Sequence, residues 1–255
     1  MIVGIIPARY ASTRLVGKPL VTIGGKPMIQ HTYESVKKSK LLSDVIIAVD
    51  DERVYDAAKK FGANVVMTPR ELNTGTDRIA YVAKKLTTAE IIVNVQGDEP
   101  FIPGKMIDQA IEPLLFDRSV NVSTLAKRIN DVTELNSPSI PKVVFDYHNY
   151  ALYFSRSPIP YVRDVVSDKK KLKTADIYKH IGLYVFRKHQ LLNFTKMKQT
   201  DLEKFEKLEQ LRLLENGIKI KVVVTEEESL SIDTKEELEA ARLYYESEIK
   251  NNSQR

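Results

Sequence analysis

The sequence of 255 residues has no cysteine and no tryptophan, and no apolar run comes near the ~20 residues that a membrane-spanning helix needs. Without cysteine the chain has no disulfide, no cysteine-bound zinc and no thiol nucleophile, which fits a reducing compartment. No basic segment precedes the apolar start of the chain, so no signal peptide is predicted. We therefore expect a cytoplasmic protein that makes no contact with a membrane.

Charges of one sign do not dominate the chain either. It has 39 lysine and arginine residues against 34 aspartate and glutamate residues, a net charge of +5, with both signs interspersed. The densest basic run, 169–173, contains no aromatic residue, so we expect an exposed mobile loop there, with a polyanion contact as the alternative. A small anionic substrate explains the basic surplus as well as nucleic acid does, and we expect no nucleic-acid partner.

Strand-like and helical segments alternate over the first 120 residues. Amphipathic and apolar patterns predict strands at 2–6, 45–49, 64–67 and 91–95 and helices at 28–38, 52–61, 76–85 and 105–112. Strands separated by helices of this length form right-handed βαβ units. The predicted fold class is therefore α/β, with a Rossmann-like, mainly parallel sheet flanked by helices.

Beyond about residue 120 the pattern becomes richer in strands. Two apolar runs, 142–145 and 150–155, flank a short polar turn and predict a β-hairpin, and 178–186 predicts another strand. The remaining predicted elements are a helix at 201–214, a strand at 218–224 and a last helix that follows Thr234, with a capping box formed by Thr234 and Glu237. A smaller β-rich section is thus expected in the second half of the chain.

The loop after the first predicted strand concentrates positive charge. It contains Arg9, Arg14 and Lys18, with the hydroxyls of Ser12 and Thr13 between them. Arginine forks and a lysine ammonium bind phosphate oxygens, and the carboxyl end of a strand is the usual ligand edge of such a sheet. The spacing is not that of a Walker P-loop. A plain solvated basic loop is the alternative, but three spaced cations after a strand favour a phosphate-binding loop.

Two carboxylates follow apolar strands elsewhere in the chain. Asp98 follows one strand, with the amide of Gln96 just before it, and Asp233 follows another. Mg²⁺ takes oxygen ligands and commonly only one or two protein carboxylates, so the pair predicts a metal site. The alternatives are structural, a tight turn at Gly97 that leaves Asp98 as a cap, and a helix-entry role for Asp233.

Several other polar residues have both a structural and a functional interpretation. Thr74 and Gly75 stand at a predicted helix start, with Arg78 in its first turn. Simple N-capping explains Thr74, whereas a helix N-terminus at the same sheet edge also contacts base or phosphate. Arg156 and His180 are further candidates for a binding site, although a lone histidine is more often structural than catalytic.

One carboxylate is out of place in the predicted helix 201–214. At ~100° per residue, Glu209 falls between Leu202 and Phe205 on the apolar stripe. A carboxylate on an apolar face needs a partner. Arg212, three residues on, is one candidate for an intrahelical ion pair, and a substrate hydroxyl is the other.

A set of motifs in this order is similar to one enzyme family. The motifs are residues 6–9 with 18–20, 75–78, 94–100, 151–156, 179–182 and 208–212. On them the chain, from about residue 3 to 244, resembles the 3-deoxy-manno-octulosonate cytidylyltransferases of the sugar nucleotidyltransferase superfamily. The first motif marks the superfamily and the later ones narrow it to this branch. Val16 departs from the family motif, which usually has proline there, and this affects the stiffness of the loop more than its charge.

The resemblance implies a reaction and a set of site residues. The reaction joins CTP and 3-deoxy-manno-octulosonate (Kdo) into CMP-Kdo and pyrophosphate, with Mg²⁺ as cofactor, in a homodimer that supplies activated sugar for lipopolysaccharide. Catalytic roles are implied for Arg9, Lys18 and Asp98, and metal binding for Asp98 and Asp233. The implied nucleotide-binding residues are Arg9, Ser12, Arg14, Lys18, Thr74, Gly75, Arg78 and Gln96. The implied sugar-binding residues are Arg156, His180, Tyr184, Glu209 and Gln210.

The sequence pattern and the resemblance together predict a single domain of the nucleotide-diphospho-sugar transferase type at 1–250. Its parts would be a nucleotide-binding part at 1–120, a β-rich section for sugar binding and dimerisation at about 121–200, and a return to the main sheet at 201–250, followed by a frayed tail at 251–255. Two other functions stay open from the sequence. One is a cytidylyltransferase for a related acid sugar, such as an 8-amino Kdo analogue or a sialic acid. The other is a module that binds a nucleotide without turning it over.

Overall fold

The structure, a computed structural model, describes residues 1–11 and 15–253, and side chains as far as residue 247. The chain divides into two units, the first formed by residues 1–108 and 228–255 and the second by 109–227. Within the described residues no helix combines the length and the apolar character that crossing a bilayer requires.

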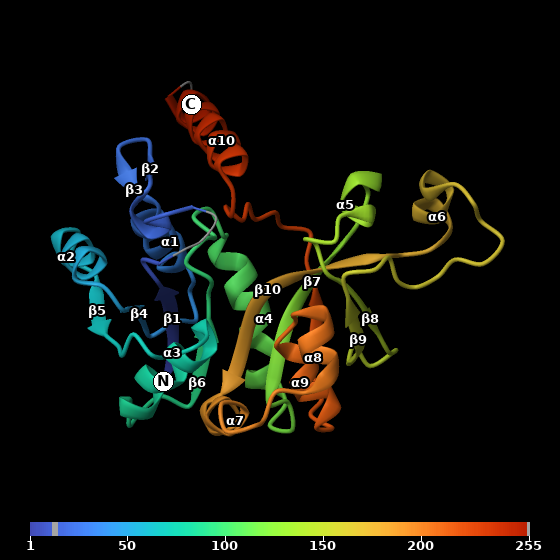
Figure 1. The fold of residues 1–255 in the computed structure, drawn as a ribbon, viewed down its shortest axis with the longest axis horizontal. Coiled ribbons are helices and arrows are strands. Elements are labelled where there is room, and N and C mark those ends of the chain that lie inside the picture. The colour runs from blue at the N-terminus through green and yellow to red at the C-terminus, as the bar shows by residue number, and fades with distance from the viewer. Residues whose placement is uncertain (12–14, 254–255) are drawn as a thin grey trace. The chain divides into compact units, whose positions relative to one another are not determined.

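The first unit is built on a parallel sheet, as the alternating pattern predicts. Its strands, in the order β6, β1, β4 and β5, are Ile91–Asn94, Ile2–Ala8, Asp44–Val49 and Asn64–Met67 (Figure 1). In the register of the sheet, Ile5 of β1 lies between Ile46 and Asn94. The side chain of Ile5 is fully buried because β1 is a central strand covered on both faces. The α/β fold class is confirmed.

The helices that accompany these strands are α1 (Met28–Val36), α2 (Glu52–Lys60), α3 (Gly75–Lys85), α4 (Gly104–Phe116) and α10 (Lys235–Ser253). Side chains cap some of them at the N-terminus. Asp51 caps α2 by accepting a hydrogen bond from the backbone N–H of Arg53, and Thr74 forms a capping box with Asp77 at the start of α3. Helix α4 runs through Pro113 and past the predicted end of the segment, from the first unit into the second.

An apolar cluster fixes α10 within the first unit. A short hairpin, β2 (Thr22–Ile23) and β3 (Lys26–Pro27), follows the 3₁₀ helix η1 (Lys18–Leu20). The buried members of the cluster come from the hairpin, α1, α10 and the segments beside them, and are Leu15, Ile23, Met28, Ile232, Leu238 and Ala241. Arg242 of α10 donates two hydrogen bonds to the carbonyl of Thr22, at 2.9 and 3.0 Å. The segment that leads into α10 is therefore held beside residues from the start of the chain.

The second unit is β-rich and mixed, as expected for this part of the chain. Strand β7 (Val122–Arg128) pairs in parallel with β11 (Lys221–Val224) and antiparallel with β10 (Tyr178–Arg187) (Figure 1). The predicted hairpin is confirmed as β8 (Lys142–Phe145) and β9 (Ala151–Ser155). The helices of this unit are α5 (Val132–Asn136), α6 (Asp168–Thr174), α7 (Lys188–Phe194), α8 (Asp201–Glu206) and α9 (Gln210–Glu215).

The prediction of one helix at 201–214 is wrong. Lys207 adopts a left-handed conformation, with φ of 53°, and separates α8 from α9. The apolar stripe that suggested one helix is only partly buried, since the side chain of Phe205 is 80% exposed whereas that of Leu208 is 6% exposed. A buried ion pair between Glu203 of α8 and Arg212 of α9 joins the two short helices instead, with Arg212 Nε 2.8 Å from Glu203 Oε2.

The prediction of a loop at 169–173 is also wrong. These lysines lie in α6, whose first residue, Asp168, forms an ion pair with Lys171 at 2.8 Å and accepts a hydrogen bond from Asn136 at 2.8 Å. An acidic residue in the first turn stabilises such a helix in two ways. It pairs with one of the lysines that follow, and it interacts favourably with the positive end of the helix dipole.

Candidate active site

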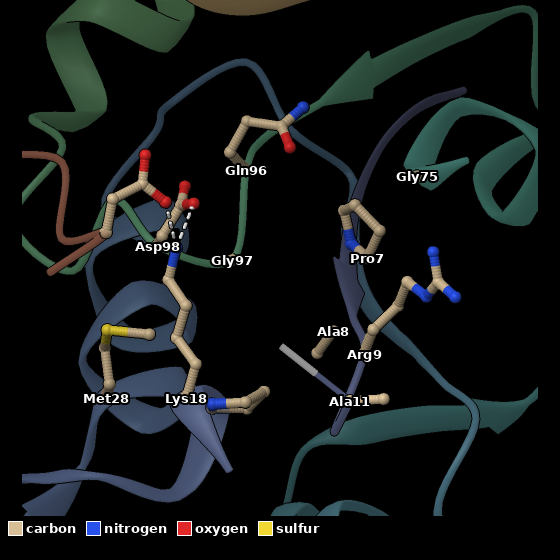
Figure 2. Close-up of a pocket in the computed structure, with 12 residues that line it drawn as sticks. Pro7, Ala8, Arg9, Ala11, Lys18, Met28, Gly75, Gln96, Gly97 and Asp98 are labelled. Carbon is tan, nitrogen blue, oxygen red and sulfur yellow. Dashed lines mark hydrogen bonds and ion pairs between the residues drawn. The ribbon is translucent and has the colours of Figure 1, made fainter. Parts of the chain in front are cut away.

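A pocket of about 670 Å³ opens in the first unit beyond the carboxyl ends of β1 and β6. Its volume lies within the range of ~300–1,000 Å³ that is usual for small-molecule sites. Figure 2 shows Lys18 and Asp98 on one side of it and Arg9 on the other. The lining residues are Pro7, Ala8, Arg9, Ala11, Lys18, Pro19, Met28, Gly75, Gln96, Gly97, Asp98 and Asp233. The cations and carboxylates that the sequence places after separate strands are thus brought to one pocket.

Lys18 lies between the two carboxylates. Its Nζ is 2.6 Å from Asp98 Oδ2 and 2.7 Å from Asp233 Oδ1, and the ammonium donates to both (Figure 2). The backbone N–H of Ile232 also donates to the carbonyl of Asp98 at 3.0 Å, which fastens the segment carrying Asp233 to the segment carrying Asp98. Two residues that are 135 positions apart in the sequence therefore face the same cation.

The donor set fits a divalent metal ion. Within the part of the chain that the structure describes, no group of three or more His, Cys, Asp or Glu side chains is arranged to hold a metal. Mg²⁺ does not need such a group, because it commonly keeps several waters and binds one or two carboxylates together with substrate phosphates. Asp98 and Asp233 already converge on one positive charge, so an ion that replaces the ammonium between them would find both ligands in place.

Glu99 follows Asp98 in the chain but is not one of the residues that line the pocket. Its carboxylate accepts a short hydrogen bond from the hydroxyl of Ser229. Burial, with a smaller contribution from the charge of Asp98, raises the pKa of Glu99 to about 7. The contact ties the segment that leads to Asp233 to the end of the pocket strand. Because it joins residues 130 positions apart, no local pattern in the sequence reveals it.

Asp50 organises the other side of the pocket. It is buried at the end of β4 and accepts hydrogen bonds from the backbone N–H of Tyr10 at 3.1 Å and from Arg78 Nη2 at 3.0 Å, while Arg9 Nε lies 3.6 Å away. Arg9 Nη1 also donates to the carbonyl of Asn73 at 3.0 Å. Asp50 therefore holds both the start of the basic loop and the arginine that the sequence assigns to phosphate. The only signal in the sequence is its position directly after an apolar strand.

The remaining nucleotide-binding candidates have different surroundings. Arg78 is fully buried against Asp50 and Thr68 and does not line the pocket, and burial lowers its pKa. Thr74 is occupied by its capping box, whereas its neighbour Gly75 lines the pocket. Gln96 lines the pocket and donates to Asn94 Oδ1 at 2.9 Å. Ser12 and Arg14, also predicted, lie outside the described residues.

Gly97 has no room for a side chain. A Cβ built on it would lie 2.7 Å from the carbonyl oxygen of Pro7, a backbone atom that cannot rotate away. We expect Gly97→Ala to lower the free energy of unfolding by about 1–3 kcal/mol and to weaken Mn²⁺ binding, because the shift of the backbone displaces Asp98. Urea denaturation and Mn²⁺ titration measure the two effects.

The matched control for this variant is Gly62→Ala. Gly62 has a positive φ of 75° and no neighbour within 4 Å of a built Cβ, so this change strains the backbone outside the pocket lining. It is expected to lower stability and leave Mn²⁺ affinity unchanged. Equal losses of Mn²⁺ affinity in the two variants would contradict the role given to the close approach at Gly97.

In the second unit, polar groups gather around β10 and the start of α9. The ring of His180 packs against the rings of Phe154 and Tyr184, with centroids at 5.0 and 5.3 Å, and its Nε2 lies 2.9 Å from Thr124 Oγ1. Burial lowers the pKa of His180 to about 3, so the imidazole is neutral at neutral pH. Burial raises the pKa of Tyr184, and the charge of Glu209 adds to this increase.

Two buried polar atoms in this region stand out. Among the described residues, neither the hydroxyl of Tyr184 nor Nε2 of Gln210 makes a hydrogen bond of good geometry, although the Thr124 side chain lies near the phenol. A buried polar group without a partner lowers the free energy of unfolding by about 1–3 kcal/mol. Two such groups on predicted binding residues therefore indicate a function in binding a ligand. Both atoms can donate to the oxygens of a ligand.

Arg156, another predicted sugar-binding residue, forms hydrogen bonds with backbone carbonyls of two separate segments. It donates to the carbonyls of Glu206 at 2.6 Å, Pro138 at 2.8 Å and Lys207 at 3.3 Å, and its own N–H donates to the Glu206 carboxylate at 2.9 Å. Nε and Nη2 of the guanidinium thus bind the end of α8, and Nη1 binds the segment before β8. The structure thus gives Arg156 a structural function, and its predicted contact with a sugar stays a prediction.

Comparison with known proteins agrees with the resemblance found in the sequence. The cytidylyltransferase family profile matches residues 3–220. Curated relatives called 3-deoxy-manno-octulosonate cytidylyltransferase include one from Geobacter sulfurreducens, 52% identical over 93% of this chain and 96% of the relative. A relative of the same name from Geotalea uraniireducens is 54% identical over 93% of this chain and 96% of its own length. The relative from Solibacter usitatus is 48% identical, with 97% and 96% covered.

Solved structures give the same result. A CMP:2-keto-3-deoxy-manno-octonic acid synthetase solved in complex with CTP superimposes with a TM-score of 0.90 at 39% identity, covering 97% of this chain and 99% of its own. A 4-diphosphocytidyl-2C-methyl-D-erythritol synthase from Anaerococcus prevotii has a TM-score of 0.62 at 18% identity, covering 96% of this chain and 98% of its own. The second likeness shows the shared fold alone.

Proposed function

Because this chain belongs to the 3-deoxy-manno-octulosonate cytidylyltransferase family, we propose that it transfers the cytidylyl group of CTP to Kdo and releases pyrophosphate. The observation that carries the proposal is the convergence of Lys18 with Asp98 and Asp233, opposite Arg9, in one pocket. A triphosphate needs such a combination of fixed positive charge and metal-binding carboxylates.

The reaction is a displacement at phosphorus. A hydroxyl oxygen of the sugar attacks the α-phosphorus of CTP and releases its proton to solvent, the bond from that phosphorus to the oxygen that bridges to the β-phosphate breaks, and pyrophosphate leaves with the electron pair. Such a step needs little covalent chemistry from the protein, which mainly positions the reactants and neutralises charge. Arg9 and Lys18 supply cations at the pocket, and Asp50 orients Arg9 through the contact at 3.6 Å.

We propose Mg²⁺ as the cofactor, held by Asp98 and Asp233. When bound, it would supply positive charge to the phosphate oxygens. The support lies in the chain's own residues, since the two carboxylates are already gathered around one cation at 2.6 and 2.7 Å. Lys18, which makes those contacts, is also long enough to turn toward a phosphate once another cation takes its place.

For the sugar, we propose the second unit. The hydroxyl of Tyr184 and the amide of Gln210 are buried donors that make no hydrogen bond of good geometry among the described residues, and Glu209 beside Tyr184 is an acceptor. A polyhydroxylated acid offers both donors and acceptors, so it can satisfy this mixed set. We also propose that the protein is a cytoplasmic homodimer and that it supplies activated sugar for lipopolysaccharide. These parts of the proposal rest on the sequence and on its resemblance to the family.

A pyrophosphate-release assay tests the proposal. The enzyme is supplied in turn with each of four nucleoside triphosphates and with Kdo, an 8-amino Kdo analogue and a sialic acid. We expect the highest kcat/KM for CTP with Kdo and no release without a sugar. If either of the other two sugars is turned over faster than Kdo, that sugar is the substrate in place of Kdo. Binding of CTP without turnover of any of the three sugars would contradict the proposed reaction and favour a nucleotide-binding module.

A further inference from the structure

Thr124 lies beneath an irregularity in the sheet of the second unit. It is a fully buried residue of β7, opposite the point where the register of β10 shifts between Ile181 and Tyr184. A β-bulge of this kind turns backbone groups out of the normal ladder. The Thr124 hydroxyl lies 2.8 Å from the carbonyl of Leu183 and 3.3 Å from that of Ile181, and it also contacts His180 Nε2 at 2.9 Å.

The proton of that hydroxyl can go to only one of these partners. Backbone carbonyls only accept, so the hydroxyl donates to the carbonyl of Leu183, its shorter carbonyl contact. The oxygen of Thr124 is then left with lone pairs that face His180, and a favourable contact at 2.9 Å requires a proton on Nε2. If the Thr124 hydroxyl donated to Nε2 instead, the carbonyl of Leu183 would lose its donor from Thr124, and one hydrogen bond would form in place of two.

The imidazole itself carries a single proton. It is enclosed by the rings of Phe154 and Tyr184, and the low pKa described above keeps it neutral at neutral pH. A neutral ring that has its proton on Nε2 has a lone pair on Nδ1. The contact with Thr124 therefore decides which kind of group the other ring nitrogen can bind.

We infer that Thr124 is a positioning residue that fixes His180 as the Nε2–H tautomer, so that Nδ1 accepts a hydrogen bond from a hydroxyl of the sugar. The inference rests on the proposed function for its ligand. It assigns the hydroxyl groups of the sugar to His180 and excludes the sugar carboxylate as the partner of that ring, because a carboxylate and an imidazole lone pair both only accept. The carboxylate is left to donors such as Tyr184 and Gln210.

Kinetics of two Thr124 variants test the inference. Thr124→Val keeps the shape of the side chain and removes the acceptor for Nε2–H, so we expect the KM for the sugar to rise about tenfold. The KM for CTP is expected to stay the same. Thr124→Ser retains the hydroxyl and is expected to restore the KM for the sugar. Equal changes in both KM values, or no restoration by serine, would mean that Thr124 acts only on the fold and would overturn the inference.

The tautomer is measured directly, without substrate, by long-range ¹H–¹⁵N correlation on protein labelled with ¹⁵N-histidine. The chain has four histidines, and the His180 signals are assigned by their loss in His180→Gln. We expect Nε2 to be protonated in the native protein and a shift toward Nδ1–H in Thr124→Val. Native Nδ1–H would overturn the inference. If the tautomer is as expected and no sugar is turned over, the proposed function fails, and the assignment of the proton stands.

Discussion

Replacing Asp98 with asparagine lowers the turnover number about 10²- to 10³-fold at saturating CTP, Kdo and Mg²⁺. The side chain keeps its size and loses the charge that faces Lys18 at 2.6 Å, so the site loses one of the two carboxylates proposed to hold the metal. The fold is expected to persist, because Lys18 retains Asp233 as a partner at 2.7 Å. Steady-state pyrophosphate release gives the turnover number, and circular dichroism checks the fold.

Mn²⁺ titration followed by electron paramagnetic resonance separates the possible reasons for that loss. Asp98→Asn is expected to weaken Mn²⁺ binding in the absence of nucleotide. Native Mn²⁺ affinity combined with low turnover would contradict the metal assignment. Glu34→Gln is the matched control, since it removes a carboxylate of the same unit whose partner, Lys26, lies on the surface. That variant should leave both turnover and Mn²⁺ affinity unchanged.

Replacing Lys18 with methionine is expected to change two quantities in opposite directions. Turnover falls by a similar factor of about 10²–10³, because a cation is lost from the pocket proposed to bind the triphosphate. Mn²⁺ binding to the nucleotide-free enzyme becomes at least about tenfold tighter, because the ammonium no longer competes for the two carboxylates. A hydrogen bond to a charged group contributes about 1.5–3 kcal/mol, which is enough for this effect.

The control for this variant is Lys26→Met, which makes the same substitution at a lysine that pairs with Glu34 outside the pocket. It should change neither quantity. Weaker Mn²⁺ binding in Lys18→Met would show that the lysine supports the metal site and does not compete for it. In that case the two carboxylates would not share one position for a cation, and the proposed arrangement of the site would be wrong.

The first unit could be predicted from the sequence because its signals are local. An apolar β-branched run such as 2–6 specifies a buried strand, and parallel strands end at a common edge. That rule alone places Lys18 and Asp98 close together, and the structure confirms their proximity. It does not identify Asp50 as a partner of Arg9 and Arg78, because any acidic residue after a strand gives the same pattern.

The second unit shows where local patterns fail. The angular position of Phe205 suggests a buried stripe, yet burial depends on which element covers that face, and none of the described residues buries this side chain, which is 80% exposed. The pair of Glu203 and Arg212 and the contact between Thr124 and His180 join separate elements. Contacts of this kind depend on tertiary packing, which periodicity does not encode.

The first unit is not a continuous piece of chain. Its pocket takes Lys18 and Asp98 from the stretch before residue 109, and Asp233 from the segment that returns after residue 227 and is held by Ser229, Ile232 and Arg242. An expression fragment that stops at residue 108 would therefore keep the parallel strands and lose Asp233, one of the two carboxylates proposed to hold the metal. Grafting of this pocket onto another scaffold would require both stretches, either as two inserted segments or through a circular permutation that joins the original ends.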